Sequence, residues 1–213
     1  MGQKIHPMGF RLGSLYTWSS RWFAEGTRYK ELVLEDVIIR ENLRKKLKIA
    51  GVSSIEIERS INKLDIIIHV AKPGMVIGRG GTGMEDIKKY LLGLLKIKAD
   101  DKNSPKVDIR IEPIKEPNLD AYLVATNIAD QLIKRMPYKR VMAQSVDRVM
   151  GGGAKGVKIM LSGRVAGAEI KRVEKDQAGI LSLQTLREKV DFASVPSLTK
   201  SGYIGVKVWI CRP

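Results

Sequence analysis

The chain has 213 residues, of which 44% are hydrophobic and 29% are charged, so it can form one large or two small domains with packed cores and is not a disordered chain. Lysine and arginine number 38 against 23 aspartates and glutamates, which gives a net charge of +15. Such a charge favours a polyanionic partner, because phosphate contacts release counterions. An anionic membrane is the competing partner, but no apolar run approaches the roughly 20 residues of a spanning helix, so we expect nucleic acid and no membrane.

The N-terminus and the cysteine content exclude several other classes. Met1 to Pro7 lacks the apolar core of a secretion signal, and His6 stands where a myristoylation motif requires Ser or Thr. The single cysteine, Cys211, allows neither an internal disulfide nor a multi-cysteine metal site. We therefore expect a cytoplasmic protein with no metal and no cofactor.

Residues 1–30 are predicted to form a basic N-terminal arm without regular periodicity. Its cations and aromatic residues include Lys4, His6, Arg11, Arg21, Arg28, Lys30, Trp18, Trp22 and Phe23. Two interpretations stay open: the arm lies on RNA with its aromatic rings available for stacking, or the tryptophans fold back onto the core.

A helix and two strands are predicted next. Residues 33–50 place apolar side chains on one side and lysines and arginines on the other, and Gly51 is a suitable C-cap. Residues 55–57 and 64–70 alternate as strands, with a turn at 61–63 between them.

A glycine-rich loop follows the second strand. Pro73-Gly74 ends the strand, Met75 to Ile77 is predicted to be a short helical turn, and Gly78-Arg79-Gly80-Gly81 precedes an amphipathic helix reaching about Lys98. The four residues fit the GXXG loop of KH domains, which clamps a nucleic acid backbone. With a third strand at 107–111, the order of elements is that of a type II KH domain, which we place at residues 31–112.

The same glycines also fit another motif. Gly78, Gly80 and Gly83 satisfy G-x-G-x-x-G, the dinucleotide-binding fingerprint. That motif requires a strand running into the first glycine and an acidic residue ending the next strand. Pro73-Gly74 breaks the strand early and Asp100-Asp101 lie in a polar loop, so the KH interpretation is favoured.

Residues 118–213 are predicted to form a second, α+β domain. One helix spans 120–135, Met136-Pro137 breaks it, and a second spans 138–150. Lys134, Arg135, Lys139 and Arg140 cluster around the break, and in so basic a chain this cluster indicates contact with a polyanion.

The remainder of the second domain is predicted to be mostly strand. Residues 157–161 and 204–210 alternate clearly, 169–176 is a strand exposed on one face, and 183–191 is either strand or short helix. Gly151 to Gly156 is not a Walker loop, because Val157 follows where Lys and Ser or Thr are needed. Together, the elements of the second domain predict an antiparallel sheet with two helices.

Four separated motifs resemble one family from end to end. GQKIHPMGFRLG, KPGMVIGRGG, GAKGVKIMLSGRVAGAEI and GYIGVKVWI are similar to the third protein of the bacterial small ribosomal subunit. The resemblance implies an N-terminal type II KH domain followed by an α+β domain in the head of the subunit. It implies that the chain binds small-subunit ribosomal RNA, touches neighbouring head proteins and lines the channel through which messenger RNA enters.

Site residues follow from the motifs that match. Gly78, Arg79, Gly80 and Gly81 match the family's GXXG. Lys139 and Arg140 match basic residues linked to gripping and unwinding messenger RNA, and we add Lys134, Arg135 and Arg148 to that group. For ribosomal RNA the basic arm and its flanks supply Lys4, His6, Arg11, Lys72, Lys88, Arg164, Lys171 and Arg172.

The chain departs from the family's pattern at three places. Ala143 replaces a third basic residue of the messenger RNA group, which weakens the expectation of unwinding. Thr82-Gly83-Met84 is rich in glycine and should loosen the start of its helix. The loop from Ala99 to Pro105 is longer than the family's common form.

No catalytic constellation is visible. Only His6 and His69 are present, and no carboxylate pair or Ser/His/Asp set stands out. We expect a non-enzymatic ribosomal protein, a monomer within a cytoplasmic or organellar ribosome. The alternatives are a dinucleotide-dependent enzyme and a KH-type RNA regulator that acts off the ribosome.

Overall fold

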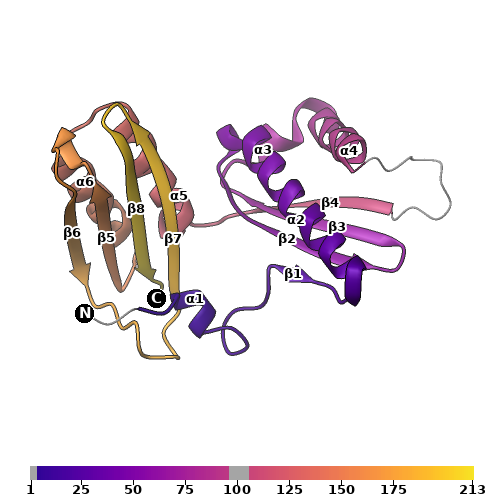
Figure 1. Ribbon diagram of the computed structural model, residues 1–213, viewed down its shortest axis with the longest axis horizontal. Coiled ribbons are helices and arrows are strands. Elements are labelled where there is room, and N and C mark those ends of the chain that lie inside the picture. The colour runs from indigo at the N-terminus through magenta and orange to yellow at the C-terminus, as the bar shows by residue number, and fades with distance from the viewer. Residues whose placement is uncertain (1–3, 96–105) are drawn as a thin grey trace. The chain divides into compact units, whose positions relative to one another are not determined.

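The computed structural model describes residues 4–95 and 106–213, which form two compact units (Figure 1). One unit is Trp18–Lys115, and the other joins the residues up to Thr17 with Glu116–Pro213. The expected arm, residues 1–30, is therefore not one segment, because Thr17 and Trp18 fall in different units. The long loop expected from Ala99 to Pro105, with Asp100-Asp101, lies outside the described residues.

The first unit has the element order predicted for a type II KH domain. Its elements are β1 (Ser20–Arg21), α2 (Gly26–Lys46), the 3₁₀ turn Lys48–Ala50, β2 (Val52–Ser60), β3 (Lys63–Val70), α3 (Pro73–Ile77), the 3₁₀ turn Arg79–Gly81, α4 (Thr82–Leu94) and β4 (Lys106–Pro113). The sheet order is β1-β2-β3-β4; β2 and β3 are antiparallel, and the other two pairs are parallel. Helix α2 begins well before the expected residue 33.

The core of this unit lies between its helices and the sheet. Its fully enclosed side chains include Ile39, Leu43, Ile57, Ile66, Ile68, Val76, Ile87 and Leu91. The spacing of Ile39 and Leu43 on α2, and of Ile87 and Leu91 on α4, is the four-residue repeat of a helix face turned to a core.

A buried carboxylate holds the start of this unit in place. The Asp36 side chain of α2 accepts hydrogen bonds from Trp22 Nε1 and Ser20 Oγ, each at 2.8 Å, and pairs with Arg59 at 2.7 Å. Trp22 thus folds back onto the unit, as one of the two interpretations of the arm predicted. Trp18 and Phe23 remain 69% and 85% exposed.

The second unit is an α+β domain with an antiparallel sheet, as predicted. Its elements are α1 (Pro7–Phe10), the 3₁₀ turn Pro117–Leu119, α5 (Ala121–Ile133), α6 (Tyr138–Gly151), β5 (Gly156–Gly163), the 3₁₀ turn Val165–Gly167, β6 (Arg172–Gly179), β7 (Val190–Thr199) and β8 (Gly202–Cys211). The sheet order is β6-β5-β8-β7, and all neighbours are antiparallel. Helices α5 and α6 cover one face of the sheet (Figure 1).

Strand β7 overlaps only the end of residues 183–191, which the sequence left undecided, and no element was predicted for the rest of the strand. Residues 183–191 contain no helix, and the strand starts at Val190. It includes Pro196, which cannot donate a ladder hydrogen bond, but β7 is an edge strand, where proline is tolerated. Among the residues that the structure describes, no helix combines the length and apolar character needed to cross a membrane.

Candidate nucleic-acid interface

The GXXG loop joins two helices. Gly78, Gly80 and Gly81 have φ values of +71°, +64° and +83°, in the left-handed region that glycine adopts without strain. Helix α3 intervenes between β3 and the loop, so the strand-to-glycine junction that the dinucleotide motif requires is absent from this part of the described chain. The KH interpretation is therefore the one that the fold supports.

The loop leaves the start of α4 without a side-chain cap. Gly81 occupies the N-cap position and has no side chain to satisfy the first N–H groups of this 13-residue helix. Such N–H groups can donate hydrogen bonds to a phosphate, which the positive end of the helix dipole also attracts. Nothing in this contact reads a base, so it suits a nucleic acid backbone.

Gly83 has a packing role that the sequence analysis missed. A Cβ at Gly83 would overlap the carbonyl oxygen of Val76 and lie 3.0 Å from that of Ile77. A Cβ at Gly78 would in turn lie 3.1 Å from the Gly83 nitrogen. The glycine expected to loosen α4 instead lets α3 and α4 approach closely, and the only sequence signal for this was its spacing from Gly78.

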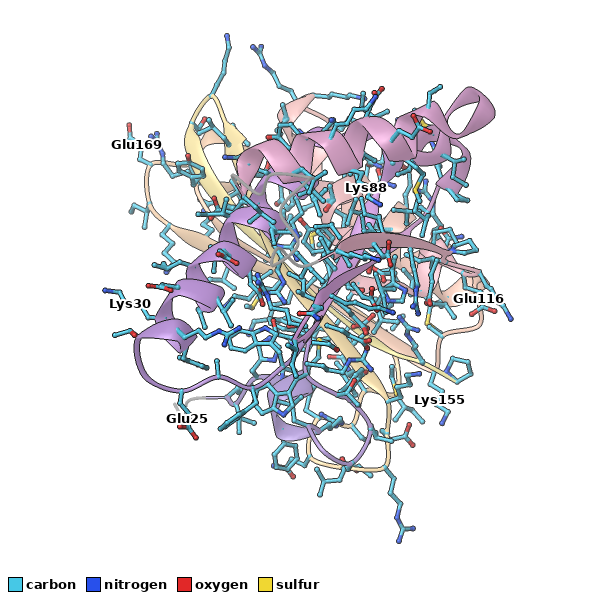
Figure 2. All side chains as sticks on the ribbon, turned by 90° about the vertical axis from the view of Figure 1, so that its right-hand side faces the viewer. Glu25, Lys30, Lys88, Glu116, Lys155 and Glu169 are labelled. Carbon is cyan, nitrogen blue, oxygen red and sulfur yellow. The ribbon has the colours of Figure 1, made fainter. Side chains whose placement is uncertain are left out.

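Two predicted cations flank the loop. Lys72 is exposed and immediately precedes α3. Lys88 projects from α4, also exposed, and its ammonium is 3.8 Å from the Asp108 carboxylate (Figure 2). Lys88 therefore carries a partly neutralised charge, whereas Lys72 takes part in no ion pair within the described residues.

The second basic group lies in the other unit, where α5 ends and α6 begins. Lys134, Arg135, Lys139 and Arg140 are all exposed, and Arg148 is exposed further along α6. Within residues 4–95 and 106–213 none of the five takes part in an ion pair. The structure thus brings together on one unit the residues predicted to hold messenger RNA.

The start of α6 concentrates positive charge. Pro137 is its N-cap and provides no side-chain hydrogen bond, and the first turn contains no acidic residue. Two cations in that turn therefore add to the positive end of the helix dipole, an arrangement that disfavours the isolated helix and favours an anion. Arg135, with φ +60°, is a non-glycine residue in the left-handed region at the turn itself.

A cleft lies beside this group within the same unit. It has a volume of about 520 Å³, and its lining includes Arg135, Tyr138, Arg164 and Lys200. Arg164, predicted to bind ribosomal RNA, thus lies on the same cleft as Arg135, predicted to bind messenger RNA. Its Nε donates to the Ala168 carbonyl at 3.0 Å.

Arg11 does not lie at the surface. It is fully buried, and its guanidinium donates to five backbone carbonyls. These are the carbonyls of Glu188 (2.7 Å), Pro7 (3.0 Å), Ser182 (3.2 Å), Leu183 (3.0 Å) and Thr185 (2.9 Å). This corrects the expectation that Arg11 contacts ribosomal RNA, because its donors are already occupied by the protein.

The other predicted residues of the second unit are exposed. His6 caps α1, where its Nδ1 accepts from the Gly9 N–H at 3.2 Å, and its ring meets Phe192 edge-on with centroids 4.9 Å apart. Lys4, Lys171 and Arg172 are exposed; Arg172 is the first residue of β6, and Lys171 immediately precedes it. None of these residues is in the unit that carries the GXXG loop.

A helix–GXXG–helix on a mixed sheet, followed by a basic α+β unit, defines an RNA-binding protein built on a type II KH domain. Comparison with protein families agrees: a KH domain model matches residues 38–119, and the model for "Ribosomal protein S3, C-terminal domain" matches residues 128–210. The chain belongs to the uS3 family of small ribosomal subunit proteins.

Full-length relatives carry the family name "Small ribosomal subunit protein uS3". One from Dictyoglomus turgidum is 49% identical over 213 residues, covering 100% of this chain and 84% of the relative. One from Lactobacillus helveticus is 50% identical, covering 100% of this chain and 91% of the relative, and one from Caldicellulosiruptor bescii is 48% identical, covering 100% and 92%. The chain is thus a non-enzymatic structural constituent of the small ribosomal subunit.

Proposed function

We propose that the chain binds ribosomal RNA in the head of the small subunit through its GXXG loop and grips messenger RNA at the entrance channel through its α6 cluster. The α6 cluster comprises Lys134, Arg135, Lys139, Arg140 and Arg148. In this proposal it also assists the unwinding of messenger RNA helices during translation. The observation that carries the proposal is that these five exposed cations gather on one unit with no acidic partner among the described residues.

Charge rather than base readout suits a moving strand. A messenger RNA passes through the channel with changing sequence, so contacts that depend on particular bases would bind some positions and release others. Phosphate contacts are the same at every step. The α6 cluster offers ammonium and guanidinium groups for such contacts, and the uncapped start of α6 adds to their positive potential.

The ribosomal RNA contacts are proposed to be spread over both units. In the first unit they are the GXXG residues with Lys72 and Lys88, and in the second unit they are Lys4, Arg164, Lys171 and Arg172. His6 holds α1 by capping it and remains exposed for a contact. Neighbouring proteins of the head complete the environment of a single copy in a cytoplasmic or organellar ribosome.

The test replaces two residues of the α6 cluster in an assembled ribosome. Ribosomes carrying Lys139→Ala/Arg140→Ala should translate through a messenger RNA hairpin more slowly than wild type, with much less effect on an unstructured message. Lys30→Ala/Lys63→Ala is the matched control, because it removes two exposed lysines from the other unit, and Lys30 lies on the outside of α2 (Figure 2). Equal slowing on both messages would contradict the proposal.

A further inference from the structure

One face of the second unit's sheet is not covered by α5 or α6, and α1 lies mainly against β7. Helices α5 and α6 pack on the face that carries Val157, Ile159, Val206 and Val208. The opposite rows form the open face: Lys158, Met160 and Ser162 of β5; Val173, Lys175 and Gln177 of β6; Phe192, Ser194, Pro196 and Leu198 of β7; and Tyr203, Gly205, Lys207 and Trp209 of β8. These rows include three lysines and no carboxylate; beyond them, Cys211 Sγ lies 3.4 Å from the Glu188 carboxylate, which is itself paired with Lys155.

Aromatic rings gather at one end of the open face. Phe192 and Trp209 face each other across β7 and β8, with ring centroids 5.1 Å apart and planes tilted by 39°. The Lys158 ammonium lies 5.9 Å from the Trp209 centroid, and His6 meets Phe192 from the edge. A ring pair flanked by cations resembles the stacking platforms on which single-stranded nucleic acids lie.

Positive charges crowd the same end of the face. The pKa of Lys158 is lowered, first by burial and then by the positive charges of Lys4 and Lys175. An anion beside Lys4 and Lys175 would stabilise the charged form of Lys158. Lys4 comes from the N-terminal segment, so the cluster exists only once that segment has docked.

A hollow adjoins Lys4 and Lys158 and has the volume of an ordinary small-molecule pocket. Its volume is about 620 Å³, and its lining includes Lys4, Phe10, Lys158, Gln177 and Leu181. Its wall also includes Ser182, Leu183 and Thr185, whose carbonyls accept the hydrogen bonds of buried Arg11. The hollow is therefore held in shape before any partner arrives.

We propose that the open face binds an unpaired segment of RNA, with a phosphate among Lys4, Lys158 and Lys175 and a base against Trp209. The inference rests on the proposed function, in that it names a further site by which this chain would hold ribosomal RNA. Charge decides the occupant: a face with three lysines and no carboxylate, next to a fourth lysine from the N-terminal segment, complements a polyanion. A neutral or basic protein surface would leave those charges unpaired.

The first test removes the charges and measures binding of a short labelled RNA without secondary structure as a function of salt. The full chain with Lys158→Gln/Lys175→Gln should bind about tenfold more weakly, and its salt slope should fall by about 1.4, the value for two lost contacts at about 0.7 each. Lys30→Gln/Lys63→Gln removes the same charge from the other unit and should change neither value appreciably. Equal losses in the two double variants would overturn the proposal.

The second test replaces the aromatic ring of Trp209. Trp209→Leu should weaken binding by about five- to a hundredfold, whereas Trp209→Phe should restore most of the affinity because it keeps a stacking surface. RNA should quench wild-type tryptophan fluorescence more than that of Trp209→Phe. If Trp209→Leu binds as wild type does, no base lies on this ring and the proposal fails.

Three outcomes separate this inference from its alternatives. If the Lys158/Lys175 variant binds RNA normally but no longer joins small subunits reconstituted from separate components, a neighbouring protein covers the open face and the proposal is overturned. If the open-face variants bind RNA as wild type does while a negative charge placed in the GXXG loop weakens RNA binding, the open face is excluded as an RNA site and the proposed function stands. If wild type binds no RNA, it is the proposed function that fails.

Discussion

Arg11 and Arg140 show two opposite uses of arginine in one basic unit. Arg11 is fully buried and donates to five carbonyls, whereas Arg140 is exposed at the start of α6 and has no ion pair among the described residues. From the sequence, both were assigned to RNA: Arg11 as a cation of the basic arm, and Arg140 as a cation of the cluster between α5 and α6 that also matches the family's messenger RNA residues. Burial and hydrogen-bond partners, not charge, decide which cation can meet a phosphate.

The same contrast separates the two proposed RNA sites. The GXXG loop would hold a phosphate with backbone N–H groups that glycine conformations expose, and the α6 cluster would hold it with side-chain cations. The first depends on fixed backbone geometry, and the second on charge. Substitutions that act on geometry and on charge should therefore affect the two units differently.

The largest effect is expected at the buried arginine. Arg11→Met should lower the free energy of unfolding of the second unit by at least about 3 kcal/mol, because it leaves several buried carbonyls without donors. Urea unfolding followed by circular dichroism measures this. Arg148→Met, at an exposed arginine of α6, should have a free energy of unfolding within about 0.5 kcal/mol of the wild-type value. A stable Arg11→Met that binds RNA poorly would reverse the assignment of roles.

The next largest effect is expected at Gly83, which lets α3 and α4 approach closely. Gly83→Ala should lower the free energy of unfolding by about 1–3 kcal/mol, since the new Cβ overlaps a backbone carbonyl that cannot move alone. Gly93→Ala in the same helix meets nothing within 4 Å and should stabilise by about 0.5–1 kcal/mol. Thermal unfolding of the two variants tests this, and two changes of the same sign would disprove the packing role.

A smaller, pH-dependent effect is expected at Tyr16. Its hydroxyl donates to the Val190 carbonyl at 2.9 Å, and burial, followed by the negative charge of Asp191, raises the pKa of Tyr16 from 10.0 to about 12. Because the folded pKa is the higher one, the contribution of Tyr16 to the free energy of unfolding is complete below pH 10 and is lost as pH rises to about 12. Between these pH values the free energy of unfolding of wild type should fall by about 1–2 kcal/mol more than that of Tyr16→Phe, allowing for screening. Parallel pH profiles would exclude this.

The smallest expected effect is a gain in RNA affinity on substitution of Ala143. Ala143 is exposed on α6, three residues after Arg140, so a cation there would extend the α6 cluster. Ala143→Lys should raise affinity for single-stranded RNA by a factor of about 1.5 to 5, the range for one exposed charge contact, and should speed passage through hairpins. Ala143→Gln adds similar length without charge and should change neither. Equal effects of the two variants would show that charge is not the cause.

The hydrophobic periodicity and the glycine and proline breaks predicted most of the fold. The element order around the GXXG loop, the break at Met136-Pro137 and the inward rows of β5 and β8 all follow from local patterns. Strand β7 did not, because Pro196 and small polar residues obscure its alternation, and its place at the sheet edge depends on pairing with β8.

The site residues were less accessible to sequence reasoning. Arg11 meets carbonyls more than 170 positions away, a contact that no local pattern encodes. The close approach at Gly83 depends on how α3 and α4 cross. Lys158 and Trp209, in contrast, could have been placed on one face from the alternation of β5 and β8, but their proximity to Lys4 required the fold.

The most direct test of RNA binding by the KH unit compares Gly80→Asp with Gly80→Asn. Gly80 has φ +64° and open space around its missing Cβ, and both side chains tolerate that conformation, so the variants differ mainly in charge. Affinity for a head fragment of small-subunit ribosomal RNA would be measured against salt. We predict that Gly80→Asp binds about five- to tenfold more weakly than Gly80→Asn, with a salt slope smaller by about 0.7–0.9. Identical affinities and slopes would contradict phosphate binding at the loop and leave it a purely architectural turn.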